Sequence, residues 1–177
     1  MNKPLAILVA EDNPNDTFFF KRAFSRAGID GPVIFVRDGQ EVIDYLSGDP
    51  PFSHRLSYPI PKLIILDLAM PRVSGFEVLE WIRRDAAFSD IPVLAFSGIQ
   101  RPTDINRAYS LGAKLFLVKT SDVDQWTAIL QRLAETYGLA HSKPARPALS
   151  AHHPEFELQT NSISQLPYGD EGFNARI

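Results

Sequence analysis

The sequence predicts an α/β domain in which a five-stranded parallel sheet is covered by helices on both faces. Two patterns support this prediction. Short apolar runs alternate along residues 4–137 with longer stretches whose apolar residues recur at helical spacing. The short runs are nearly continuous in apolar residues, as in parallel strands that are buried on both faces. Right-handed crossovers between successive strands would then give a doubly wound sheet.

The five predicted strands are the short apolar runs, each bounded by turn residues or charge. They are residues 5–10, 33–36, 63–66, 91–96 and 115–118. One helix is expected after each strand. The apolar faces of these helices are formed, in order, by Phe20, Ala23, Phe24 and Ala27; by Val42, Ile43 and Leu46; by Phe76, Val78, Leu79 and Ile82; by Ile105, Ala108 and Leu111; and by Trp126, Ile129, Leu130, Leu133 and Tyr137.

Residues at the predicted helix ends favour the same assignment. Gly28 is suited to end the first helix, because glycine adopts the left-handed conformation common at helix C-termini. Pro102 fits the first turn of the fourth helix. Ser121 or Asp122 is placed to cap the fifth helix.

Two segments depart from the alternating pattern. Residues 48–62 contain four prolines and predict a long loop before the third strand. Residues 138–177 lack helical spacing and hold four prolines and three of the four histidines. We therefore predict one domain over residues 1–137, followed by an extended or disordered tail over residues 138–177.

Composition excludes several classes of function. The chain of 177 residues has no cysteine, which rules out disulfides, cysteine-ligated metals and cysteine nucleophiles. Its formal net charge is -3 and no basic block stands out, which argues against a nucleic-acid surface. No signal-peptide core is visible, and no apolar run approaches the roughly 20 residues that span a bilayer. We expect a cytoplasmic protein that binds neither nucleic acid nor membrane.

Polar residues gather at the carboxyl ends of the predicted strands, where open α/β sheets bind ligands. They are Glu11 and Asp12 after the first strand, Asp67 after the third, Ser97 after the fourth and Lys119 after the fifth. If the third strand lies beside the first, three carboxylates converge and repel one another unless a cation joins them. Magnesium suits such an oxygen site. Asp67 could then accept a phosphoryl group, with Lys119 and Ser97 stabilising its charge.

Each of these residues has a simpler explanation when taken alone. Asp12 could cap the first helix, Lys119 could be an ordinary lysine at a strand end, and Ser97 could belong to a turn. All of them, however, lie at the same end of successive strands of one predicted sheet. That shared position favours a common site.

The motifs around these residues resemble the receiver domains of two-component response regulators, the CheY-like family. The resemblance covers roughly residues 4–137. It is carried by residues 7–13 (ILVAEDN), residues 64–71 (IILDLAMP) with Ser74 and Gly75, residues 93–98 (VLAFSG) and residues 112–119 (GAKLFLVK). It implies a flavodoxin-like (βα)5 fold and a receiver domain over residues 1–137.

The resemblance also implies a role for each site residue. Asp67 would be the phosphorylated aspartate. Asp12 would bind magnesium directly and Glu11 through water, with the backbone carbonyl of Ala69 as a further ligand.

On the same resemblance, Ser97 and Lys119 would contact the phosphoryl group. Ser97 and Phe116 would switch conformation when that group is present. A core phenylalanine is the alternative interpretation of Phe116.

The function implied is that of a single-domain phosphorylation switch rather than an enzyme. It would assist its own magnesium-dependent phosphoryl transfer and lose the group slowly. The donor would be a sensor histidine kinase or a phosphotransfer protein. The long loop at 48–62 and the single-domain layout resemble regulators served by phytochromes. The family commonly uses the face of the fourth helix, fifth strand and fifth helix for partners or a homodimer.

Two residues depart from the family pattern. Thr120 follows Lys119 where the family usually has proline, often in a cis bond. A cis bond before a residue other than proline costs about 2.5–4 kcal/mol, so we expect a trans bond here. Ala69 replaces a polar residue often found at that position.

Three other classes of function fit the sequence less well. A phosphorylation-independent docking module with a receiver-like fold is disfavoured, because such modules tend to lose an acidic residue or the lysine. A haloacid-dehalogenase-like phosphatase would need a second aspartate two residues after Asp67, where Ala69 stands. A nucleotide-binding enzyme would need a glycine-rich loop after the first strand, and none is present.

Overall fold

The computed structural model describes residues 6–29, 31–98 and 101–139. Within them, five strands alternate with five helices, as predicted. The strands are β1 (Ile7–Ala10), β2 (Val33–Val36), β3 (Leu63–Asp67), β4 (Val93–Ser97) and β5 (Leu115–Val118). The helices are α1 (Pro14–Ala27), α2 (Gly39–Ser47), α3 (Gly75–Arg84), α4 (Pro102–Ser110) and α5 (Val123–Tyr137). The predicted tail lies outside the described residues from residue 140 onward.

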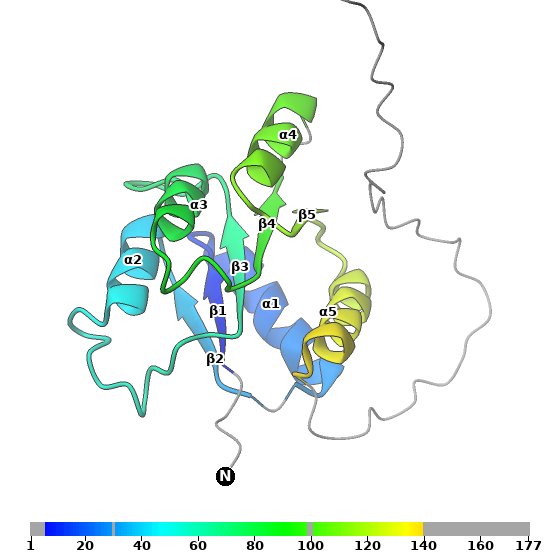
Figure 1. The fold of residues 1–177 in the computed structure, drawn as a ribbon. Helices are drawn as coiled ribbons and strands as arrows, with labels where there is room; N and C mark the ends of the chain where they lie inside the picture. Colours follow the sequence, from blue (N-terminus) through cyan, green and yellow to red (C-terminus); the bar gives the residue numbers. More distant parts are fainter. Residues whose placement is uncertain (1–5, 30, 99–100, 140–177) are drawn as a thin grey trace, which may run out of the picture. The chain divides into compact units, whose positions relative to one another are not determined.

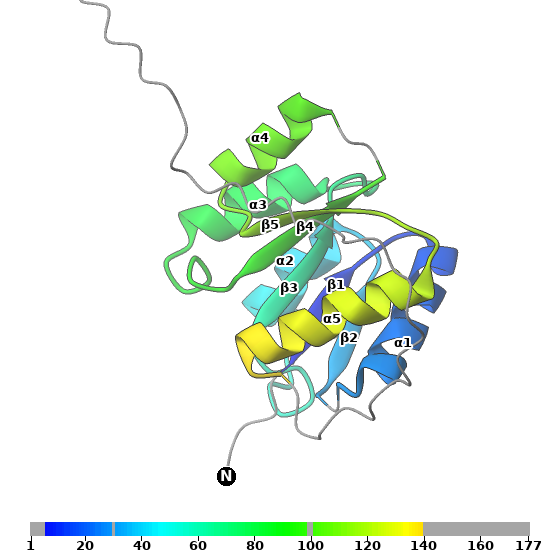
Figure 2. The same ribbon diagram turned by 90° about the vertical axis from the view of Figure 1, so that its right-hand side faces the viewer.

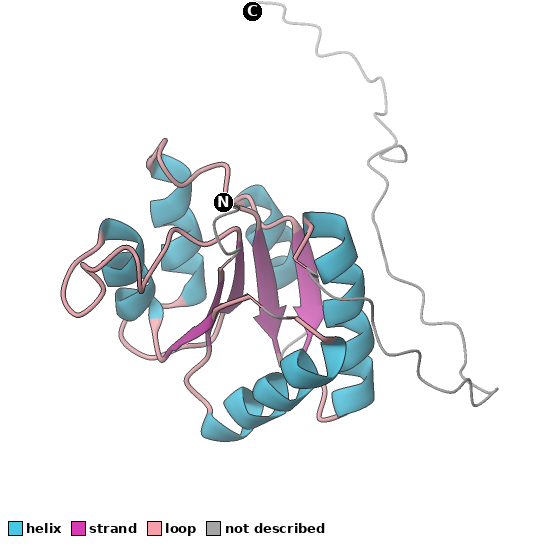
Figure 3. Ribbon diagram, turned by 90° about the horizontal axis from the view of Figure 1, so that it is seen from below, coloured by secondary structure: helices cyan, strands magenta, loops and turns pink. Residues whose placement is uncertain are grey.

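All strand pairs are parallel, and the strand order is β2-β1-β3-β4-β5 (Figure 1). This is the flavodoxin-like arrangement predicted from the sequence. Helices α1 and α5 pack on one face of the sheet, while α2, α3 and α4 pack on the other. The two further views show the sheet between these two layers (Figure 2 and Figure 3). Strands β1, β3 and β4 are buried along their whole length, which explains their continuous apolar sequences.

The strand ends differ slightly from the prediction. The fourth strand begins at Val93 rather than at residue 91. Pro92 has no N–H to donate, and the Ile91 N–H bonds back to the Phe88 carbonyl at 2.9 Å. At their carboxyl ends, β3 and β4 extend to Asp67 and Ser97. Both polar residues are therefore held in the backbone ladder of the sheet, rather than lying in the loops that follow.

Helix caps decide two points that the sequence left open. The Asn13 side chain accepts a hydrogen bond from the Asn15 N–H at 2.9 Å, so Asn13, and not Asp12, caps α1. Asp12 thereby remains available at the strand end. Asp122, and not Ser121, caps α5. Gly28 ends α1 in the left-handed conformation, with φ of 67°.

The long loop at 48–62 is packed against α2. Arg55 donates hydrogen bonds to the carbonyls of Tyr45 and Leu46, at 2.7 and 2.6 Å, where the last turn of α2 leaves carbonyls without helical partners. The ring of Tyr45 also contacts Phe52 and Tyr58 of the loop, with centroid distances of 5.2 and 6.1 Å. The core face of α2 includes Tyr45, which is buried. Ile43, which was predicted for this face, is only half-buried.

Among the described residues, none of the helices combines the length and the apolar character that crossing a membrane requires.

Gly75, at the first turn of α3, is expected to be essential for packing against β3. A Cβ atom at this position would overlap the Asp67 carbonyl oxygen and lie 2.8 Å from Leu68 Cα. Backbone atoms cannot move aside as a flexible side chain can. Gly75→Ala should therefore lower the free energy of unfolding by about 1–3 kcal/mol. Gly98→Ala is the control, because a Cβ there meets nothing within 4 Å and should change stability by less than about 0.5 kcal/mol. Equal urea midpoints for the two variants would contradict this account.

Candidate functional site

Three carboxylates converge at the carboxyl end of the sheet, as the sequence predicted. Strand β1 pairs with β3 so that Ala10 lies opposite Leu66, and the acidic residues follow directly. Ligand oxygens of Glu11, Asp12 and Asp67 all lie within 4.8 Å of one another. Glu11 and Asp67 are buried and Asp12 is exposed, so the cluster opens to solvent on the Asp12 side.

Both oxygens of the Asp67 side chain are engaged. Oδ1 accepts a hydrogen bond from the Ala69 N–H at 2.9 Å. Oδ2 accepts one from Lys119 Nζ at 2.7 Å. The first bond fixes the carboxylate against the loop that follows β3. The second places a positive charge directly on the outer oxygen of Asp67.

Lys119 is shared among three carboxylates. Its ammonium lies 2.7 Å from Glu11 Oε2, 2.7 Å from Asp67 Oδ2 and 2.9 Å from Asp16 Oδ2. The site predicted from the sequence did not include Asp16, which lies in the first turn of α1. Asp12 precedes the helix cap Asn13, so the rule that residues four apart share a helix face does not relate it to Asp16, and no signal in the sequence places Asp16 beside Lys119.

Burial and charge act against each other on the two buried partners of this network. Burial raises the pKa of Glu11 to about 7, although its hydrogen bond from Lys119 and that from the Asn13 N–H lower it. Burial lowers the pKa of Lys119, but the hydrogen bonds to Asp67, Glu11 and Asp16 outweigh it, so the pKa lies above its ordinary value. Lys119 is therefore charged at neutral pH, and the raised pKa of Glu11 lies close to neutrality.

Ser97 lies between Asp67 and Lys119 in the sheet. It is buried at the end of β4, next to Phe96, which is the register partner of Asp67. Its carbonyl accepts a hydrogen bond from the Lys119 backbone N–H at 2.9 Å. The structure thus brings together all five polar residues that the sequence predicted at the strand ends, Glu11 among them.

Phe116 lies in the middle of β5 and is half-buried against the core on the α4 side. Its backbone N–H donates to the Tyr109 hydroxyl of α4 at 3.2 Å. This position links β5 to α4. Its role in switching stays a prediction, as does the contact of Ser97 with a phosphoryl group.

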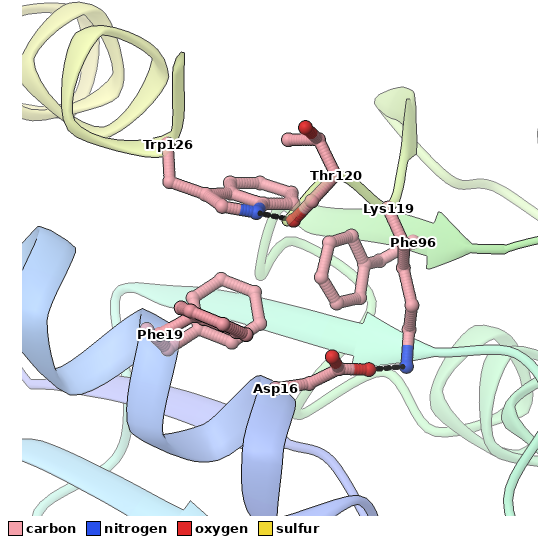
Figure 4. A pocket seen from close by; sticks show the side chains of 7 residues that line it. Asp16, Phe19, Phe96, Lys119, Thr120 and Trp126 are labelled. Atoms are coloured by element: carbon pink, nitrogen blue, oxygen red, sulfur yellow. Dashed lines mark hydrogen bonds and ion pairs between the residues drawn. The ribbon is translucent and has the colours of Figure 1, made fainter. Parts of the chain in front are cut away.

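A small cavity lies beside Lys119 on the α1 and α5 side (Figure 4). It is lined by Asp16, Phe19, Phe20, Phe96, Lys119, Thr120 and Trp126. The Trp126 indole N–H donates to the Thr120 carbonyl at 2.8 Å. Among the described residues the cis peptide bond is Pro50–Pro51, so the Lys119–Thr120 bond is trans, as expected. The Trp126 hydrogen bond fixes the backbone after Lys119 where the family usually has proline.

The chemistry of the donors fits a hard divalent cation. Glu11, Asp12 and Asp67 offer only carboxylate oxygens, with no nitrogen or sulfur ligand in the cluster. Magnesium prefers such oxygens and retains several waters, which the exposed Asp12 side would admit. A buried carboxylate with a cation on its outer oxygen is also placed to receive a phosphoryl group.

Fold and site together define a receiver domain of two-component signalling. The sequence matches the response regulator receiver domain family over residues 7–131. The chain therefore belongs to that family.

Known relatives and structures agree with this assignment. The regulatory protein FilR2 of Methanothrix harundinacea, a probable regulator of methanogenesis, is 32% identical over 145 residues, which are 82% of this chain and 90% of FilR2. The structure of RPA3017, a regulator in red light signalling of R. palustris, is 32% identical with a TM-score of 0.71, covering 80% of this chain and 99% of RPA3017. The structure of the Mn²⁺-bound form of the response regulator Rcp1 is 27% identical with a TM-score of 0.67, and the match covers 82% of this chain and all of the chain in that structure. Rcp1 of Synechocystis sp. is 28% identical over 130 residues, which are 73% of this chain and 86% of Rcp1.

Metal affinity should depend on pH through Glu11. Burial raises the pKa of this carboxyl from 4.5 to about 7, so the folded protein holds the proton more tightly than the unfolded chain. Its contribution to stability is thus present below about pH 4.5 and lost as the pH rises through 7. A divalent cation needs the deprotonated form. Magnesium should therefore bind roughly tenfold more tightly at about pH 8 than at about pH 6.

An NMR titration of magnesium at the two pH values measures this dependence. Glu11→Gln is the control, since it cannot titrate and should bind weakly with little pH dependence. The same affinity of the natural sequence at both pH values would contradict the role of Glu11.

Proposed function

We propose that this receiver domain accepts a phosphoryl group on Asp67 and thereby changes its binding partner. The observation that carries the proposal is the ion pair between Lys119 and Asp67, at 2.7 Å, within a cluster of three carboxylates. In the proposed site, Asp12 and Asp67 would hold magnesium directly, Glu11 would hold it through water, and the Ala69 carbonyl would be a further ligand. When bound, it supplies positive charge that offsets the phosphoryl oxygens.

The transfer follows from the position of the Asp67 side chain. An oxygen of the carboxylate attacks the phosphorus of a phosphohistidine, a P–O bond forms, and the P–N bond breaks with its electron pair passing to the imidazole nitrogen. The product carries roughly -1.5 to -2 charges at neutral pH. Lys119 pairs with those oxygens, and the Ser97 hydroxyl donates to one of them.

The signal is proposed to pass from the site to the face formed by α4, β5 and α5. Ser97 and Lys119 end the two strands beside that face, and Phe116 connects β5 to α4 through Tyr109. Movement of the two polar residues toward the phosphoryl group would shift Phe116 and change the face. A partner, or a second copy of this chain, would then bind there.

A sensor histidine kinase is the proposed phosphoryl donor, with a phosphotransfer protein as the alternative. A phytochrome-type kinase is favoured by the structural relatives, which include the phytochrome response regulator RcpA and the bacteriophytochrome response regulators RtBRR and AtBRR. The receiver domain is proposed to span residues 1–137, with residues 138–177 as a separate tail. Family membership favours the predicted cytoplasmic location.

Phosphorylation should occur once and only on Asp67. Incubation with magnesium and a small phosphodonor is expected to add the mass of one phosphoryl group to the natural sequence. Asp67→Asn should add none, because the amide is not a nucleophile comparable to the carboxylate. Asp90→Asn is the matched control, an exposed acid in the loop before β4 that should be phosphorylated normally. Intact-mass measurement decides: phosphorylation of Asp67→Asn would place the acceptor on another residue. A natural sequence that gains no mass would favour the phosphorylation-independent docking module.

Lys119→Ala should separate phosphorylation from switching. Some transfer to Asp67 is expected to persist, but without the ammonium nothing draws β5 toward the phosphoryl oxygens. Size-exclusion chromatography with light scattering, before and after phosphorylation, follows self-association or binding of the partner. Lys62→Ala, an exposed lysine before β3, is the control and should switch normally. A normal response of phosphorylated Lys119→Ala would show that the coupling runs through other residues.

A further inference from the structure

Asp16 differs from the other two carboxylates that contact Lys119. Glu11 and Asp67 belong to the cluster that fits a divalent cation, whereas Asp16 does not. An ammonium group has three N–H donors, and here it has three carboxylate partners at 2.7, 2.7 and 2.9 Å. Two of the three donors therefore bond to carboxylates that also belong to the metal cluster. The lysine and the metal compete for Glu11 and Asp67.

The surroundings of Lys119 leave it few other acceptors. The wall of the neighbouring cavity is formed largely by the rings of Phe19, Phe20, Phe96 and Trp126 (Figure 4). The carbonyl of Thr120 accepts the Trp126 indole N–H, and its hydroxyl accepts the Asp122 backbone N–H. Among the residues that line this cavity, Asp16 is the acid that can hold the ammonium away from the metal cluster.

We propose that Asp16 is a positioning residue that retains Lys119 when a divalent cation takes up the oxygens of Glu11 and Asp67. The ammonium then keeps a carboxylate partner without displacing the metal, and the lysine remains beside Asp67 in the loaded site. This role rests on the proposed function, since it presupposes a metal at Glu11, Asp12 and Asp67.

Removing the charge of Asp16 should weaken metal binding through Lys119. In Asp16→Asn the Lys119 ammonium loses a charged partner and interacts more strongly with Glu11 and Asp67. Magnesium must then displace the ammonium from these carboxylates, which makes the free energy of magnesium binding less favourable. The Kd for magnesium should rise on the order of fivefold, the size expected when two residues in one ion-pair network are coupled.

A double-mutant cycle tests whether the effect passes through Lys119. Magnesium affinity is measured by NMR titration of four proteins, each with the full chain: the natural sequence, Asp16→Asn, Lys119→Ala and the double variant. Without Lys119 there is no ammonium to retain, so Asp16→Asn should change the Kd by less than about twofold in that background. An effect of the same size in both backgrounds would overturn the proposal, as would no effect in the natural background.

Asp124→Asn controls for the loss of one charge at a helix start. Asp124 lies in the first turn of α5, as Asp16 does in the first turn of α1, but it pairs with Arg26 at the surface. It should leave the Kd unchanged, and a rise equal to that of Asp16→Asn would overturn the proposal. A natural sequence that binds no magnesium would contradict the metal site and this proposal together, whereas the other contrary outcomes leave the proposed function standing.

Discussion

The balance of charge around the Lys119 ammonium is the constraint on which the site depends. Two buried carboxylates, Glu11 and Asp67, lie close together and would be strongly destabilising without a cation beside them. Lys119 supplies that cation from the last strand of the sheet. One side chain, directly after β5, thereby connects the segment of β1 and α1 with β3, although these three parts are far apart in the sequence. The lysine therefore offsets part of the charge of the acidic site from within the chain itself.

The strand order makes that reach possible. With β3 in the centre of the sheet, Asp67 has β1 and its two acids on one side and β4 with Ser97 on the other. Lys119 follows β5, one strand beyond, and a long side chain covers the remaining distance. The close approach of α3 at Gly75 fixes the start of the following helix against the same strand. The fold thus places Asp67 and Ser97 within paired strands. Glu11 and Lys119 directly follow their strands, and their backbone N–H groups bond to the neighbouring strands.

The sequence was sufficient to predict the strands, the fold and the convergence of Glu11, Asp12 and Asp67. Continuous apolar runs reveal buried parallel strands, and residues directly after such strands must meet at one edge. Contacts that depend on the packing of a helix were not accessible in this way. Whether Asp16 faces Lys119 depends on how α1 lies on the sheet, and Tyr45 can be buried since its hydroxyl donates to the Pro59 carbonyl at 2.7 Å. Arg55 likewise reaches its carbonyl partners only because the 48–62 loop folds back along α2.

The hydrogen bond from Trp126 to Thr120 has a spectroscopic consequence. The indole is one of two in the chain, and it packs against Phe20 and Phe96 beside the Lys119 side chain. The other, Trp81, stacks on Phe88 on the opposite side of the sheet. Tryptophan emission responds to nearby charge and to the hydrogen bond of its indole. The protein therefore contains an intrinsic optical probe at the wall of the cavity beside Lys119, and its second indole lies on the opposite face of the sheet.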